Sequence, residues 1–214
     1  KKMTVLITGA TGLVGQELVN LLLQNGHNVH YLSTSKSKLV TNTNYKGFYW
    51  NPKKAEIDTN ALTGVEVIIH LAGANVAKKW TTAYKEEIIE SRVLSTQLLY
   101  QTLQKNSHQV KQIISASAVV IYHDSLTNIY HETDLDIDVS FLGNVVKQWE
   151  NEVSQFEKLE IIVSKIRIGI VLAKNGGALQ EMAKPIKYEE EEAISSGEQY
   201  KSWIHVQDLV AIFQ

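Results

Sequence analysis

The chain has 214 residues, of which 44% are hydrophobic, and this is enough to fill the core of one large α/β domain. Its 21 basic and 23 acidic residues give a net charge of -2, which argues against a nucleic-acid partner. The absence of cysteine excludes disulfides and thiolate metal sites, and no apolar run is long enough to span a membrane. We therefore expect a cytoplasmic protein without nucleic-acid or membrane partners.

Short runs rich in valine and isoleucine alternate along the chain with longer segments of helical periodicity. Runs with the continuous apolar character of strands buried on both faces lie at 3–8, 28–32, 66–72, 111–117 and 160–168. Amphipathic stretches that predict helices lie at 13–26, 84–105 and 144–158. Parallel strands need a crossover connection, so this alternation predicts an α/β fold with a doubly wound parallel sheet.

The regular alternation ends near Ala173, and the following segment carries Gly176, Gly177, Pro185 and Gly197. The pattern predicts three parts, a sheet domain, a small substrate-side segment and a return to the first domain, at 1–173, 174–202 and 203–214. The run of glutamates at 189–192 is typical of a solvated loop or helix face. The last part begins a new helix, and we expect this helix and the small substrate-side domain to be incomplete.

The first predicted strand is followed at once by the sequence ITGATGLVG, which places glycines at positions 9, 12 and 15. Gly9 permits a tight turn, Gly12 lets the backbone approach a pyrophosphate, and Gly15 allows the next helix to pack on the strand. The N-terminus of that helix offers unpaired N–H groups and a partial positive charge to phosphates. This strand–turn–helix context favours a dinucleotide-binding loop over an ordinary tight turn.

The end of the second predicted strand bears on which dinucleotide is bound. NAD-binding folds of this kind place a carboxylate there, about 20 residues after the glycines, to hold the ribose hydroxyls. Here the sequence is YLSTSKSK, in which Ser33, Thr34 and Lys36 offer hydrogen bonds and charge to a 2′-phosphate. The sequence therefore favours NADP over NAD, with a merely solvated lysine loop as the alternative interpretation.

Further motifs carry a resemblance to a known family. The pattern TGxxGxxG and the sequence HLAGAN resemble extended short-chain dehydrogenases and nucleotide-sugar epimerases. The segments KWTTAYKEEIIESRVLSTQLL, SASAVVIY, GGAL and GEQYKSWIHVQDL are similar to the YfcH-like epimerase family of atypical short-chain dehydrogenases. The resemblance implies a Rossmann fold of the extended type, an NADP-like cofactor and a small-molecule substrate.

The resemblance also implies particular cofactor contacts. They lie in the glycine turn, after the second and third predicted strands and on the long helix, at Gly9, Gly12, Leu13, Val14, Gly15, Ser33, Thr34, Leu71, Ala72, Gly73, Glu87 and Arg92. Without the resemblance, Arg92 would be interpreted as a surface charge on a helix.

The chemistry of the superfamily implies where catalytic groups should lie. It needs a serine that hydrogen-bonds the substrate oxygen, and a tyrosine acid/base whose pKa is lowered by a lysine four residues later. Ser117 occupies the expected serine position, although a serine that only caps the strand end is equally compatible. Phe141 and Val145 stand where the tyrosine and lysine belong, and neither can move a proton.

Other groups near the serine strand are candidates for the missing acid/base. Tyr122 has the strongest claim because it follows that strand directly, with a packing aromatic as the alternative interpretation. His123 and His131 lie in the same region, and histidine titrates near neutral pH. The histidines show no metal-ligand spacing, so we expect no metal.

Two functions remain open on the sequence. The first is an NADP-dependent oxidoreductase or epimerase that acts on a nucleotide-sugar or another small carbonyl or hydroxyl compound. The second is a non-catalytic nicotinamide-dinucleotide-binding module that regulates a partner or senses redox state. The glycine turn fits both, Ser117 favours the enzyme, and Phe141 with Val145 favours the module. We favour the enzyme, and leave open whether it forms a homodimer.

Overall fold

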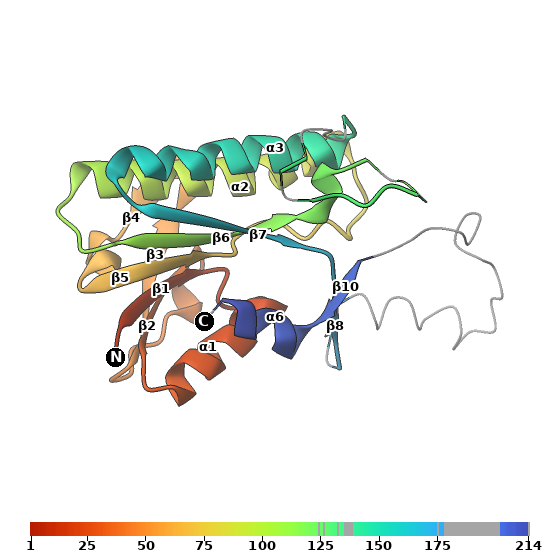
Figure 1. Ribbon diagram of the computed structural model, residues 1–214. Helices are drawn as coiled ribbons and strands as arrows, with labels where there is room; N and C mark the ends of the chain where they lie inside the picture. The colour runs from red at the N-terminus through yellow and green to blue at the C-terminus, as the bar shows by residue number, and fades with distance from the viewer. Residues whose placement is uncertain are drawn as a thin grey trace.

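A seven-stranded sheet forms the centre of the molecule in the computed structural model (Figure 1). The structure describes residues 1–123, 125, 127–131, 133–134, 139–174, 176–177 and 202–213. The predictions for the glutamate run, Pro185 and Gly197 lie outside these residues. The strands follow the order β4-β3-β2-β1-β5-β6-β7. Their bounds are β1 Thr4–Thr8, β2 Asn28–Ser33, β3 Tyr45–Asn51, β4 Glu56–Ile57, β5 Val65–His70, β6 Gln112–Ala118 and β7 Ile162–Ile168.

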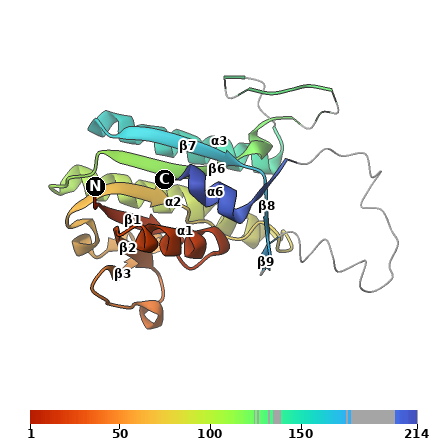
Figure 2. The same cartoon turned by 60° about the horizontal axis from the view of Figure 1, so that its bottom comes forward.

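Adjacent strands of this sheet pair in parallel, except β3 with β4, which is antiparallel. Helices cover both faces, so the predicted doubly wound α/β fold is confirmed. On one face lie α2 Thr82–Lys105 and α3 Phe141–Ser154, and on the other α1 Leu13–Gln24 and α6 Val206–Ile212 (Figures 1 and 2). A smaller sheet of order β10-β8-β9 follows, with β8 Ile170–Ala173, β9 Gly176–Gly177 and β10 Trp203–His205. Short 3-10 turns are η1 Lys36–Lys38, η2 Pro52–Lys54, η3 Thr59–Leu62, η4 Val119–Ile121 and η5 Gln155–Leu159.

The three long helices begin and end where local chemistry places their termini. Thr81 caps α2, its Oγ1 accepting a hydrogen bond from the Tyr84 N–H at 3.1 Å, so the helix starts two residues before the predicted boundary at 84. Ser140 caps α3 in the same way, with 3.3 Å to the Gly143 N–H. The apolar faces of the helices then bury against the sheet, whose strands contribute fully buried residues such as Leu6, Ile68 and Ile113.

Several elements differ from the sequence-based expectation, and the short strands β4, β8 and β9 are among those that were not predicted. Strand β3 was not predicted, because its sequence YKGFYWN lacks a valine–isoleucine run and only Trp50 in it is buried. The last stretch, expected to be helical from Trp203, first forms β10 and becomes helical at Val206. Three β10 residues pair in parallel with β8, so strand pairing takes the segment that precedes the helix.

Candidate functional site

The glycine turn connects β1 to α1 at the point where the sheet topology reverses. From β1 the chain continues to β2 on one side, whereas β5 lies on the other side of β1. Open α/β sheets bind ligands in the crevice at the carboxyl ends of the strands at such a point. The sequence therefore places its glycines at the position in the fold where a nucleotide site is expected.

The structure gives a different reason for the presence of each of the three glycines. Gly9 has a φ of +73°, and a Cβ on it would lie 2.9 Å from the carbonyl carbon of Leu71. A Cβ on Gly15 would lie 2.1 Å from the Gly9 oxygen, so this residue lets α1 approach the turn. A Cβ on Gly12 would meet that same oxygen only at 3.4 Å, an ordinary contact. Gly12 is therefore not required by the packing of the protein itself.

The N-terminus of α1 is open to a ligand. Gly12 is the N-cap residue and supplies no side-chain cap, and the first turn of α1 carries no acidic residue. Leu13 and Val14 follow as the first helical residues and pack their side chains on the buried cluster under α1. The first N–H groups of the helix thus keep the capacity to bind an anion, as a pyrophosphate-binding turn requires.

Buried hydrogen bonds hold β1, β5 and α2 together beneath this turn. Thr8 Oγ1 accepts from the N–H groups of Leu71 and Ala72, each at 3.1 Å, and lies 2.7 Å from His70 Nδ1. His70 Nε2 lies 2.9 Å from Thr96 Oγ1. Burial lowers the pKa of His70 to about 3, so the ring is neutral and acts as a fixed bridge between strand and helix.

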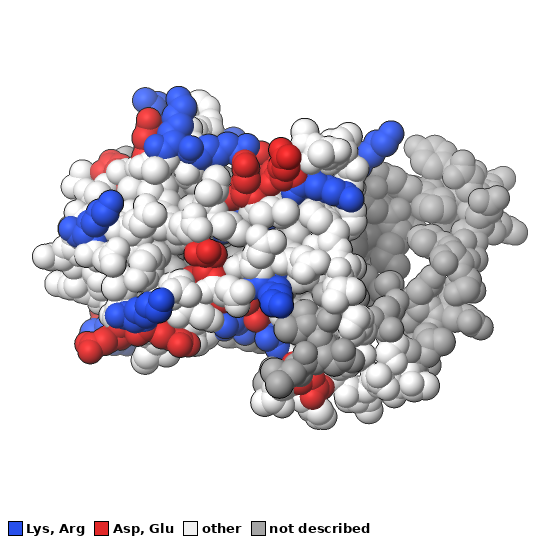
Figure 3. All heavy atoms as spheres, turned by 90° about the horizontal axis from the view of Figure 1, so that it is seen from above, with Lys and Arg blue, Asp and Glu red and all other residues white. Residues whose placement is uncertain are grey.

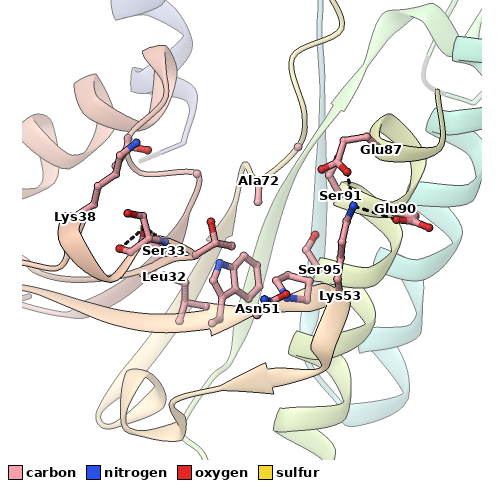
Figure 4. Close-up of a pocket in the computed structure, with 17 residues that line it drawn as sticks. Leu32, Ser33, Lys38, Asn51, Lys53, Ala72, Glu87, Glu90, Ser91 and Ser95 are labelled. Carbon is pink, nitrogen blue, oxygen red and sulfur yellow. Dashed lines mark hydrogen bonds and ion pairs between the residues drawn. The ribbon is translucent and has the colours of Figure 1, made fainter. Parts of the chain in front are cut away.

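A cavity of about 440 Å³ opens beside the glycine turn (Figure 4). Among the predicted cofactor residues, those that line it are Gly9, Ser33, Thr34, Ala72, Gly73 and Glu87. The lining residues that sequence reasoning did not assign to the site are Thr11, Leu32, Ser35, Lys38, Trp50, Asn51, Pro52, Lys53, Glu90, Ser91 and Ser95. Most of these come from the ends of β2 and β3 and from one face of α2.

The cavity end next to β2 carries hydroxyl and ammonium groups. Ser33 Oγ accepts a hydrogen bond from the Ser35 N–H at 3.1 Å and donates to its carbonyl at 3.3 Å, which orders the turn after β2. The 3-10 turn η1 brings Lys38 to the cavity wall. The predicted Lys36 instead lies with its Nζ 5.0 Å from the centre of the Tyr49 ring. The described end of β2 carries no carboxylate, as the sequence indicated.

The opposite end of the cavity is bounded by an ion-pair cluster between η2 and α2. Lys53 Nζ is hydrogen-bonded to Glu87 and lies 3.4 Å from Glu90 Oε2 (Figure 4). The hydrogen bond to Glu87 raises the pKa of the Lys53 ammonium. Glu87, predicted to face the cofactor, is thus held by a lysine from the end of β3. No sequence signal pointed to this lysine, because β3, which pairs in parallel with β2 and carries the chain to this end of the site, was not predicted.

Arg92 lies inside the fold beside Gly73. Its Nη2 donates to the Ala74 carbonyl at 3.2 Å, and its Cζ lies 5.3 Å from the centre of the Trp149 ring. A Cβ on Gly73 would lie 2.9 Å from Arg92 Cζ, so the glycine makes room for the guanidinium. Burial lowers the pKa of Arg92. Arg92 is thus a half-buried cation beside Gly73 and not a charge on an exposed helix face, although it does not itself line the cavity.

The two predicted catalytic residues belong to one hydrogen-bonded chain. Ser117, at the end of β6 and 4% exposed, donates from Oγ to Glu150 Oε1 at 2.5 Å. Glu150, on α3, accepts from Arg167 Nε and Nη2, both at 2.9 Å. Arg167 Nη1 donates to Tyr122 Oη at 2.5 Å, and Tyr122 Oη donates to the His131 carbonyl at 3.0 Å. Ser117 and Tyr122 are thus connected through an ion pair between α3 and β7.

The charges in this chain are stabilised by one another. Burial alone would raise the pKa of the Glu150 carboxyl, but hydrogen bonds from Arg167 and Ser117 outweigh it and leave the pKa below its ordinary value. The hydrogen bond to Glu150 raises the pKa of Arg167. Glu150 is therefore an anion and Arg167 a cation at neutral pH.

The two positions expected for a tyrosine–lysine pair, Phe141 and Val145, serve packing contacts in the structure. Phe141 opens α3 and packs edge-on against Trp80, with ring centres 5.4 Å apart, while Lys85 Nζ lies 5.1 Å from its ring centre. Val145, one turn later, is 2% exposed and belongs to the core. Neither side chain has a group that gives or takes a proton.

Other kinds of site find no support in the part of the chain that the structure describes. There, no group of three His, Asp or Glu side chains lies close enough together to hold a metal ion. Among the same residues, no helix has both the length and the apolar character to cross a membrane. The surface over α2 and α3 mixes basic and acidic side chains and has no extended basic patch (Figure 3).

Comparison with known proteins gives similarities to one family. Residues 5–139 match the family model described as NAD dependent epimerase/dehydratase family. An epimerase family protein of Staphylococcus aureus is 36% identical over 209 residues, which are 96% of this chain and 67% of the relative. The human epimerase family protein SDR39U1, crystallised with NADPH, is 28% identical with a TM-score of 0.79, covering 99% of this chain and 68% of that one. A nucleoside-diphosphate sugar epimerase from Corynebacterium glutamicum is 30% identical with a TM-score of 0.80, covering 100% and 43%.

Proposed function

The chain belongs to the NAD dependent epimerase/dehydratase family, and from this premise we propose that it is an NADP-dependent oxidoreductase or epimerase of nucleotide-sugars or other small carbonyl or hydroxyl compounds. The family assignment confirms the resemblance inferred from the sequence motifs. The observation that carries the proposal is the glycine turn opening onto a cavity whose β2 end holds hydroxyl groups and a lysine but no carboxylate. The human relative crystallised with NADPH supports the same cofactor.

The residues present fit a nicotinamide dinucleotide. The uncapped N-terminus of α1 would hold the pyrophosphate, with Gly12 leaving the space that the phosphates need. Ser33, Thr34 and Lys38 would hold the 2′-phosphate by hydrogen bonds and charge, with Lys36 as the neighbouring cation. Contacts further along the cofactor would come from the β5 end and α2, at Leu71, Ala72, Gly73, Glu87 and Arg92. When bound, the nicotinamide supplies a hydride or accepts one.

Replacing Lys38 tests the cofactor preference. In Lys38→Met we expect NADPH affinity to fall about tenfold, equivalent to about 1.4 kcal/mol, with NADH affinity unchanged, because only NADPH carries the 2′-phosphate. Calorimetric titration of both cofactors measures this. Lys46→Met is the matched control, since Lys46 is an exposed lysine on β3 outside the cavity lining. Equal losses for both cofactors in Lys38→Met would argue against a phosphate site there.

For the chemical step we propose that Ser117 and Tyr122 contact the substrate oxygen, with Tyr122 as the proton-transfer group. We also propose, from the sequence pattern alone, that residues 174–202 form a substrate-side segment. The relative named as a nucleoside-diphosphate sugar epimerase supports a nucleotide-sugar as the first substrate class to test. A panel of nucleotide-sugars and small carbonyls, followed by nicotinamide absorbance and by product analysis, tests this, because epimerisation gives no net absorbance change.

A second function is favoured by a specific observation. Phe141 and Val145 leave the usual dyad positions without a proton-transfer group, which suits a nicotinamide-dinucleotide-binding module that regulates or senses. Tight cofactor binding together with no turnover on the whole panel would favour this module. Turnover that depends on Tyr122 would favour the enzyme.

A further inference from the structure

We propose that Arg167 is a positioning residue for Tyr122, and that it supplies from β7 the cation that the superfamily takes from a lysine on the helix after the serine strand. The proposal rests on the function proposed above, in which Tyr122 moves the proton. The observation behind it is the direct contact of Arg167 Nη1 with the Tyr122 hydroxyl oxygen, at 2.5 Å.

The guanidinium is held in one orientation by the carboxylate behind it. Nε and Nη2 donate in parallel to the two oxygens of Glu150, each at 2.9 Å, and this two-point contact fixes the plane of the group. Nη1 then points to Tyr122, whose ring centre lies 5.3 Å from Arg167 Cζ. The positive end of the ion pair therefore faces the phenol, and the negative end faces Ser117.

The other contacts of Tyr122 place its hydroxyl as an acid/base group requires. The ring stacks on Tyr130, with ring centres 5.2 Å apart and the planes 12° from parallel. Its hydroxyl donates to the His131 carbonyl at 3.0 Å while accepting from Arg167. The phenol keeps its proton and donates it in a hydrogen bond to the carbonyl of the exposed residue His131, an acceptor that a substrate oxygen can replace.

The same ion pair assigns different roles to the two hydroxyls. Ser117 has one proton, and it is donated to Glu150, so Ser117 cannot donate to a substrate oxygen while the pair is intact. Proton delivery to that oxygen therefore falls to Tyr122. In the oxidative direction Tyr122, as the phenolate, would take the proton of the substrate hydroxyl, with a bound nicotinamide as the hydride acceptor. In the reductive direction the phenol would return that proton, and Arg167 would keep its own protons in both.

Several charged or titratable groups surround Tyr122. Arg167 faces it from β7, Tyr130 stacks on its ring, and Glu150 of α3 lies on the far side of the guanidinium. Lys165, also on β7, donates from Nζ to Ser154 Oγ on α3 at 2.7 Å and acts on Glu150 through its charge. His123 follows Tyr122 directly in the chain. Of these, Arg167 is the cation whose N–H contacts the phenol oxygen.

Carbon-13 NMR of ring-labelled tyrosine at one fixed pH tests the role of Arg167 without a substrate. The Tyr122→Phe variant assigns the Tyr122 signal. In Arg167→Met we expect the signal of the ring carbon that bears the Tyr122 hydroxyl to move away from its wild-type position, because the phenol oxygen loses the hydrogen bond that it accepts from Arg167. Arg167→Lys should return it most of the way. Lys165→Met, which removes one positive charge from the same strand, should leave it nearly unchanged.

A second variant removes the risk that an unpaired Glu150 unfolds the protein. The double variant Glu150→Gln/Arg167→Met carries no charge at either position, and we expect the same displacement of the Tyr122 signal in it. A signal position that is unchanged in both the single and the double variant would overturn the proposal, as would an equal displacement in Lys165→Met. Titration of these variants with NADPH is a separate measurement, whose failure in the wild type would count against the proposed function and not against the Arg167–Tyr122 contact.

Discussion

Replacing Gly12 with valine should abolish cofactor binding and leave the fold intact, whereas Gly15→Ala should destabilise the fold itself. A Cβ at position 12 meets only the Gly9 oxygen, at 3.4 Å, and the backbone there is extended with φ -77°, which valine adopts readily. We therefore expect the free energy of unfolding of Gly12→Val to stay within about 1 kcal/mol of wild type. The added methyl groups occupy the space before the first N–H groups of α1, where the pyrophosphate is proposed to bind.

The Gly15 substitution acts on the backbone itself. A Cβ there lies 2.1 Å from the Gly9 oxygen and 2.8 Å from the Ala10 Cα, and both are backbone atoms that cannot rotate away. Overpacking in a tight site ordinarily costs about 1–3 kcal/mol, and this contact is at the severe end. For a chain of this size a loss of about 3 kcal/mol lowers Tm by about 6–12 °C.

The two variants are compared in two assays, NADPH titration by calorimetry and thermal unfolding without cofactor. We expect at least a tenfold loss of NADPH affinity in Gly12→Val, about 1.4 kcal/mol or more, with Tm changed by less than about 4 °C. Gly15→Ala should show the large fall in Tm. Wild-type NADPH affinity in Gly12→Val would refute a pyrophosphate site at this turn, and a wild-type Tm in Gly15→Ala would refute the close approach of α1.

Three further outcomes are expected. Because His70 has a folded-state pKa of about 3 against an ordinary 6.5, the unfolded chain binds its proton first as the pH falls, and stability should drop by about 1.4 kcal/mol per pH unit between pH 6 and 4. Denaturant unfolding at several pH values should show this slope reduced in His70→Gln; an equal slope would argue against a neutral buried ring. Tyr122→Phe should lower turnover on any substrate of the panel by about 10²–10⁴-fold and leave NADPH affinity unchanged. Turnover near the wild-type rate in this variant would show that another residue transfers the proton. Glu150→Ala leaves the Arg167 guanidinium and the Ser117 hydroxyl without their acceptor, so the free energy of unfolding should fall by about 2–3 kcal/mol. Denaturant titration measures this, and an unchanged free energy of unfolding would argue against the ion pair.

The sequence predicted those elements of the fold whose own residues form a recognisable pattern. Continuous apolar runs predicted β1, β2, β5, β6 and β7. Strand β7 has such a run although it lies at the edge of the sheet and none of its residues is fully buried. Strand β3 was not predicted, because its aromatic residues are mostly half-buried and Gly47, in its middle, lies against the Tyr31 ring. Such a strand is recognisable only once its partner β2 is in place.

One part of the candidate site could be predicted from a short stretch of sequence, whereas another part depends on contacts between distant segments. The glycine turn is local, since its glycines lie close together in the sequence at positions 9, 12 and 15, although Gly9 also makes room for the backbone of Leu71. The Ser117–Glu150–Arg167–Tyr122 chain is not, because it depends on β6 pairing with β7 so that Ser117 stands opposite Arg167. From sequence alone, Glu150 is one acid on an amphipathic helix and Arg167 one cation in a strand.

The lysines after β2 show that the sequence does not reveal the local geometry of even a single turn. Lys36 and Lys38 are equivalent in the sequence, two cations in a polar loop. The 3-10 turn at 36–38 separates them, since it places the Lys36 ammonium over the Tyr49 ring while Lys38 lines the cavity. Turn geometry of this kind follows from packing against β3, which the sequence did not predict.

Calorimetric titration of the wild-type chain with NADPH and, separately, with NADH tests the proposed function most directly. We expect both to bind at one site per chain, with NADPH binding more tightly, because the β2 end of the cavity offers hydroxyls and a lysine to the 2′-phosphate and no carboxylate to the ribose. Binding of neither cofactor would contradict a dinucleotide site at the glycine turn. A clear preference for NADH would contradict the assignment of NADP.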